Sequence, residues 1–111
     1  HMKWDERLAD MINKLILVVF ILLQMSALKA LEINMSEGHE IFIQKCMACH
    51  GESGDGKLPG QPNFSKGDAF YKSDSVLIDV NREGKGVMPG FDGVLSEEEI
   101  RNVVAYIKTF L

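Results

Sequence analysis

Two thiols and an imidazole stand within five consecutive residues, Cys46-Met47-Ala48-Cys49-His50. Thiols three positions apart lie on one helical turn, where both can bond to the vinyl groups at one edge of a haem. The imidazole that follows directly can then ligate the iron. This C-x-x-C-H pattern predicts one covalent c-type haem, attached through Cys46 and Cys49 and ligated by His50.

Two other uses of a C-x-x-C pair fit the sequence less well. A thioredoxin-like redox disulfide requires a βαβ context, which this sequence lacks. A zinc site requires four ligands, and only His39 is available beside Cys46, Cys49 and His50. We interpret His39 as a surface or packed histidine.

The iron of such a haem needs a second axial ligand, and Met88 is the best candidate. It precedes Pro89-Gly90 in a glycine-bracketed loop, residues 86–93, where its thioether can point inward. We interpret Met35 and Met47 as core residues. A His/Met pair leaves no open position on the iron and favours Fe(II), which suits outer-sphere electron transfer.

Short helices are expected to position these residues. Ser36 is expected to cap a helix over residues 37–48 that carries the cysteines. Ser73 or Asp74 is expected to cap a second helix, which runs to about Glu83 and ends at a glycine. The apolar face expected for this second helix comprises Val76, Leu77 and Val80.

A third helix is expected near the C-terminus. Ser96 and Glu99 have the spacing of a capping box, with Ser96 as the N-cap. Apolar residues then recur at helical spacing, and they are Ile100, Val103, Val104, Ile107 and Leu111. Because no strand pattern of useful length appears, the sequence predicts an all-α fold.

Residues 36–111 resemble a class I monohaem cytochrome c of the cytochrome c6 or c553 type. Gly38 and Phe42 lie eight and four residues before the first cysteine, where the family has a glycine and an aromatic residue. Tyr106 matches the aromatic residue of the family's C-terminal helix. The resemblance implies three to four helices wrapped around one covalent haem in a domain over residues 34–111. It implies an electron carrier rather than an enzyme, acting between redox proteins of a respiratory or photosynthetic chain.

The same resemblance assigns residues around the haem. Pro62 lies twelve residues after His50 and matches the family proline whose carbonyl accepts a hydrogen bond from the histidine Nδ1–H. Pro59 is a rival for that role. The aromatic residues expected to keep the haem pocket dry are Phe42, Phe64 and Phe91.

The first 33 residues differ from the rest of the chain. Hydrophobic residues make up 19 of the first 30 positions, against 32 of the remaining 81. Leu15–Leu23 is an unbroken apolar run that fits a signal peptide, with Ala27 and Ala30 as small residues near a cleavage point. A retained helix, associated with the membrane or a membrane complex through residues 4–33, is the alternative. Both readings place the domain in the periplasm or on the outer face of the cytoplasmic membrane.

The net charge of the chain bears on the kind of partner that it can bind. The net charge of −4 makes nucleic-acid binding through phosphate neutralisation a poor fit. Redox protein donors and acceptors are the expected partners. A catalytic or sensory haem domain with a displaceable sixth ligand is the alternative function. A third hypothesis is a haem-free structural protein with a Cys46–Cys49 disulfide.

Overall fold

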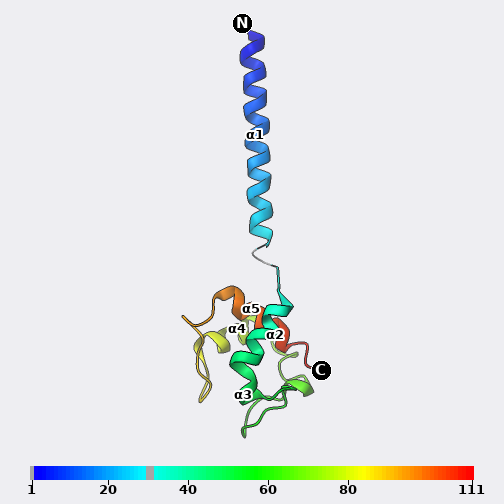
Figure 1. Ribbon diagram of the computed structural model, residues 1–111, viewed down its shortest axis with the longest axis vertical. Helices are drawn as coiled ribbons and strands as arrows, with labels where there is room; N and C mark the ends of the chain where they lie inside the picture. Colours follow the sequence, from blue (N-terminus) through cyan, green and yellow to red (C-terminus); the bar gives the residue numbers. More distant parts are fainter. Residues whose placement is uncertain (1, 30–31) are drawn as a thin grey trace. The chain divides into compact units, whose positions relative to one another are not determined.

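The computed structural model describes residues 2–29 and 32–111. The chain divides into two compact units, His1–Glu32 and Ile33–Leu111. All regular structure in the described residues is helical, which confirms the predicted all-α class. The elements in chain order (Figure 1) are α1 (Met2–Lys29), α2 (Met35–Ile41), the π-helix η1 (Phe42–Cys46), α3 (Met47–His50), the 3₁₀-helix η2 (Phe64–Lys66), α4 (Asp74–Glu83) and α5 (Glu97–Ile107).

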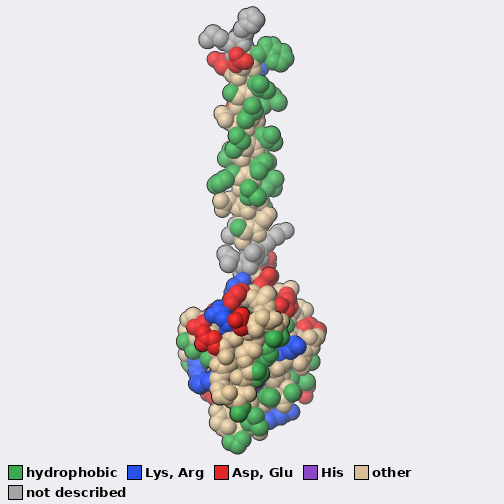
Figure 2. Space-filling view, turned by 90° about the vertical axis from the view of Figure 1, so that its left-hand side faces the viewer, with side chains coloured by type: hydrophobic (Ala, Val, Ile, Leu, Met, Phe, Trp, Pro, Cys, Tyr) green, Lys and Arg blue, Asp and Glu red, His purple; other side chains and the backbone are tan. Residues whose placement is uncertain are grey.

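Helix α1 is a single long helix whose apolar side chains lie uncovered (Figure 2). It has no glycine or proline to interrupt it. The segment Lys3–Ala27 is long and apolar enough to cross a membrane, with a mean hydropathy of 1.9 in its most apolar window, and none of that window is buried. Ala27 lies within the helix, whereas Ala30 of the predicted cleavage point lies outside the described residues.

The cysteine-bearing helix begins at a different residue from the one predicted. Asn34, not Ser36, is the N-cap, and its side chain accepts a hydrogen bond from the Glu37 N–H at 3.0 Å. The Asn34 N–H also donates to Oδ1 of Asn102 in α5 at 2.9 Å. The two residues of this contact are 68 positions apart in the sequence. Local spacing does not reveal such a contact, and without it Asn34 and Ser36 are equivalent candidates for the N-cap.

A π-helical turn interrupts the same helical run. The structure places η1 between α2 and α3, and the Met47 N–H donates to the carbonyl of Phe42, five residues earlier. A π-turn adds one residue to the turn and so rotates the side chains that follow it. The sequence predicted an uninterrupted helix here.

The caps of the other two helices confirm the predictions. The Ser73 hydroxyl accepts from the Val76 N–H at 3.3 Å, and Ser96 forms a reciprocal capping box with Glu99. The predicted apolar faces are only partly right. Val76 is 48% exposed and Leu111 is 71% exposed. Helix α4 is short and buries one side along Leu77, while α5 ends before Leu111, so neither residue reaches the core.

The core of the domain lies where α2 and η1 meet α5, and α4 packs on α5 from another side (Figure 1). Gly38 of α2 is buried directly beneath Asn102 and Tyr106 of α5. The rings of Phe42 and Tyr106 lie 5.5 Å apart at this contact. Buried side chains of the core are Ile41, Phe42, Cys46, Phe64, Ala69, Leu77, Ile100, Val103, Val104 and Ile107.

Candidate functional site

The two cysteines and the histidine lie at the C-terminal end of the helical run. Cys46 is buried at the end of η1, Cys49 is exposed in α3, and His50 is buried as the last residue of α3. Both cysteines are free thiols, so the structure contains no Cys46–Cys49 disulfide. Burial, with a smaller contribution from Cys49, raises the pKa of Cys46 to about 11, which keeps that thiol protonated at neutral pH.

The imidazole of His50 lies against an aromatic ring. Its centroid is 4.9 Å from that of Phe64, and the two rings are stacked. Burial lowers the pKa of His50, so the ring is neutral at pH 7 and a nitrogen lone pair is available to a metal. Nδ1 is buried and has no hydrogen-bond partner. The predicted hydrogen bond to the Pro62 carbonyl is therefore not formed in this structure.

The loop after His50 folds back onto the end of α3. The Gly56 N–H donates to the His50 carbonyl at 2.8 Å, and the Lys57 N–H donates to the Cys49 carbonyl at 3.3 Å. The Pro62 carbonyl lies against Gly56, where a Cβ would come within 3.3 Å of it. Pro62 is half-buried in this loop, whereas Pro59 is exposed. The Pro62 carbonyl therefore lies close to the backbone that follows the histidine.

Met88 lies in a tight loop at the end of α4. The backbones of Met88 and Lys85 exchange hydrogen bonds of 3.0 and 3.1 Å. A Cβ on Gly84 would lie 2.6 Å from the Met88 carbonyl, and a Cβ on Gly90 would lie 2.7 Å from the Arg82 carbonyl. Only glycine allows so close an approach. Met88 is half-buried in this loop.

The three predicted aromatic residues are all buried, but in different surroundings. Phe64 stacks on His50 and so belongs to the site itself. Phe91 lies in the Met88 loop, three residues after Met88. Phe42 packs against Tyr106 and Phe110, so its observed contacts belong to the helix crossing.

The residues present fit a haem attached through thioethers. The set contains two unpaired thiols, a neutral imidazole and a thioether, which are the groups that c-type haems use. Two exposed apolar residues are next in sequence to residues of this set. Leu58 follows Lys57, whose N–H donates to the Cys49 carbonyl, and Val87 precedes Met88. An apolar macrocycle would cover such side chains.

The zinc alternative finds no support. In residues 2–29 and 32–111, the structure brings together no group of three His, Cys, Asp or Glu side chains that could hold a metal ion. His39 instead lies exposed, with its ring 5.1 Å from that of Tyr106. This placement agrees with its interpretation as a surface histidine.

The sequence did not predict two polar residues that join the helices around the site. Asn102 is fully buried and bonds to both Asn34 and Glu37, which ties α5 to the start of α2. Arg82 joins α4 to the start of α5 through Glu97. The partners lie 15 to 68 residues away, so no local pattern marks them.

Comparison with known proteins identifies the family. The family profile described as "Cytochrome C oxidase, cbb3-type, subunit III" matches residues 33–107. The cbb3-type oxidase subunit CcoP of Rhodobacter capsulatus is 37% identical over 100 residues, covering 81% of this chain and 34% of that protein. Cytochrome c6 of Euglena viridis is 35% identical over 75 residues, covering 63% of this chain and 85% of that protein.

A solved structure shares the fold. Cytochrome c6 of the diatom Phaeodactylum tricornutum matches with a TM-score of 0.60 and 31% identity, covering 68% of this chain and 92% of that one. The chain spans only 26 to 34% of the length of the oxidase subunits that it matches. The chain therefore belongs to the cytochrome c family described as subunit III of cbb3-type cytochrome c oxidase, and its cofactor is haem c.

Proposed function

We propose that this protein transfers electrons through one haem c, attached by Cys46 and Cys49 and ligated by His50 and Met88. The observation that carries the proposal is the state of His50. Its imidazole is buried, held neutral and stacked on Phe64, one residue after the exposed thiol of Cys49. A buried neutral imidazole beside two free thiols is suited to fixing an iron porphyrin to the chain.

The two residues that would ligate the haem iron, His50 and Met88, lie on constrained backbone. His50 is the last residue of a helix whose carbonyls accept hydrogen bonds from the following loop. The backbones of Met88 and Lys85 each donate a hydrogen bond to the other. When bound, the haem supplies an iron that changes oxidation state without exchanging ligands. Phe64 excludes water from one side of His50, which lowers the local dielectric and tunes the reduction potential.

We further propose that α1 is retained and anchors the domain to the membrane. Lys3, Arg7 and Lys14 lie in its first half, and Lys14 is paired with Asp10 at 2.9 Å. These basic residues precede the apolar run Leu15–Leu23, and basic residues at one end of an apolar run favour the cytoplasmic side, so the C-terminal domain would lie on the outer side. The matched CcoP protein is named as a subunit of a cytochrome c oxidase, which supports a respiratory oxidase as the partner.

The Met88 ligand separates an electron carrier from a haem domain with an open or displaceable site. The oxidised, haem-loaded full chain should show the weak far-red absorption band of methionine bound to ferric haem. Met88→Ala should abolish the band, whereas Met35→Ala should retain it. The interpretation of Met35 as a core residue is wrong: as the first residue of α2 it is 46% exposed, because that helix buries Gly38 and Ile41 instead. Absence of the band from the unaltered protein at neutral pH, or its survival in Met88→Ala, would contradict the proposal.

A further inference from the structure

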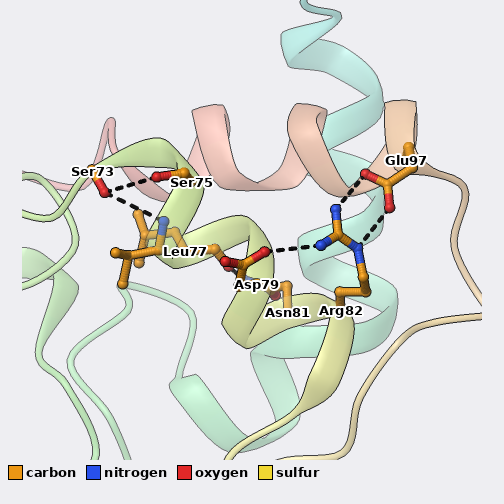
Figure 3. Close-up of polar contacts among 8 residues, drawn as sticks. Ser73, Ser75, Leu77, Asp79, Asn81, Arg82 and Glu97 are labelled. Atoms are coloured by element: carbon orange, nitrogen blue, oxygen red, sulfur yellow. Dashed lines mark hydrogen bonds and ion pairs between the residues drawn. The ribbon is translucent and has the colours of Figure 1, made fainter.

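We infer that Arg82 and Glu97 are positioning residues that hold the Met88 loop in place. The inference rests on the proposed ligation by Met88 and adds the device that maintains it. Nε of Arg82 donates to one carboxylate oxygen of Glu97 at 2.7 Å, and Nη2 donates to the other at 2.8 Å (Figure 3). Nη1 donates to Asp79 at 2.9 Å. The guanidinium is thus held in one orientation by two carboxylates.

The pair joins the two ends of the segment that carries Met88. Arg82 is the penultimate residue of α4, and Glu97 is the first residue of α5. Residues 84–96 connect these helices and include the proposed ligand. Closing the ends of a loop reduces the number of conformations that the loop can adopt. The ion pair therefore restricts where Met88 can lie.

The backbone of Arg82 holds the same loop directly. Its carbonyl accepts a hydrogen bond from the Asp92 N–H at 3.1 Å, and the Asn81 carbonyl accepts one from Phe91 at 2.8 Å. Gly90 lies so close to Arg82 that a Cβ would come within 2.7 Å of the Arg82 carbonyl. Displacement of Arg82 would therefore be passed to residues two to four positions beyond Met88.

A second ion pair between the same helices provides a matched control. Nζ of Lys108 lies 2.5 Å from a carboxylate oxygen of Asp74, at the opposite ends of α4 and α5. Asp74 and Lys108 are comparable in exposure to Arg82 and Glu97, but they do not flank the Met88 loop. Loss of this pair should weaken the packing of α4 on α5 without releasing the loop.

The test measures how easily an external ligand displaces Met88 in the oxidised, haem-loaded full chain. Arg82→Gln and Glu97→Gln should each raise the apparent affinity for imidazole about two- to fivefold, the scale of one exposed ion pair. The double variant should match Arg82→Gln, because that change already removes the contact with Glu97 together with the one to Asp79. Amide hydrogen exchange at residues 85–92 should quicken in each variant, as a readout independent of the iron.

Lys108→Met is the control and should leave imidazole affinity and exchange in the loop unchanged. Arg82→Lys should raise the imidazole affinity less than Arg82→Gln does, because a lysine keeps the positive charge but cannot make the bidentate contact with the carboxylate. An imidazole affinity that is unaltered in Arg82→Gln, or altered equally in Lys108→Met, would overturn the positioning role while leaving Met88 as a ligand. Absence of the far-red band from the unaltered protein would instead overturn both the ligation and this role.

Discussion

Gly38 of α2 lies directly against the backbone carbonyl of Asn102 of α5, with no space between them for a side chain. A Cβ at position 38 would also lie 3.0 Å from the Cβ of Tyr106. The obstruction is backbone, which cannot move aside by changing a rotamer. This crossing supports the helical run that presents the cysteines and His50, so its geometry bears on the site.

Gly38→Ala should therefore destabilise the domain. Overpacking costs about 1–3 kcal/mol and more where backbone must shift. The better helix propensity of alanine than of glycine offsets at most about 1 kcal/mol of this loss. We expect a net loss of about 2 kcal/mol, measured by denaturant unfolding of the haem-loaded protein. Ser36→Ala, an exposed change in the same helix, is the control and should stay within about 0.5 kcal/mol. Equal stability of the two variants would show that the close crossing does not form.

Local signals predicted the two helices that carry the Met88 loop, but not the start of α2. Ser73 and Ser96 cap their helices through atoms only three residues away, which a sequence pattern can reveal. Asn34 and Ser36 are equally good caps by composition. The choice of Asn34 involves a bond from its N–H to Asn102, a contact that forms only once α5 has packed.

The acid dependence of stability should reveal the Arg82–Glu97 pair. The hydrogen bond from Arg82 lowers the pKa of Glu97 in the folded state. A lowered folded pKa stabilises the protein above the unfolded value, about 4.3, and this contribution disappears as pH falls through the folded pKa. The stability difference between the unaltered protein and Glu97→Gln should thus be present at pH 7 and smaller at pH 3, measured by urea unfolding.

Glu98→Gln is the matched control for that titration, because Glu98 is exposed and adjacent. The structure records no ion pair for Glu98 in the described part of the chain. Its stability should parallel that of the unaltered protein at both pH values. A Glu97→Gln difference that persists undiminished at pH 3 would exclude the charged pair as its cause.

Removal of the haem should unfold most of the C-terminal domain. A domain of about 80 residues has a small core, and domains of this size are marginal without a staple such as a cofactor. Replacing both cysteines, Cys46→Ala with Cys49→Ala, should remove the covalent haem and most of the domain's helical circular dichroism. In detergent the signal of α1 should remain, since that helix lies in the separate N-terminal unit. Retention of full helicity and stability by this variant would show that the protein core suffices alone.

Membrane fractionation should decide the fate of α1. If α1 is an anchor, the mature protein keeps residues 2–29 and remains with the membrane after alkaline carbonate washing. Replacement of residues 2–29 with a cleavable export signal should release the domain into the soluble fraction. A mature N-terminus found after Ala27 would instead identify the segment as a signal peptide.

The site was more predictable than its supports, for a physical reason. Cys46, Cys49 and His50 are adjacent in sequence because their chemistry acts on one edge of one cofactor, so a pattern can identify them. The orientation of His50 depends on Phe64, and the Met88 loop depends on Arg82 and its partner across 15 residues. Such contacts are set by packing rather than by spacing.

The central claim, that haem c is fixed to the chain through Cys46 and Cys49, is tested most directly by intact mass under denaturing conditions. The protein should come from a host that attaches c-type haem. We predict the mass of the chain plus one haem, because thioether bonds survive unfolding. The same measurement on the Cys46→Ala, Cys49→Ala variant should give the chain alone. A mass without haem in the unaltered protein would contradict the account.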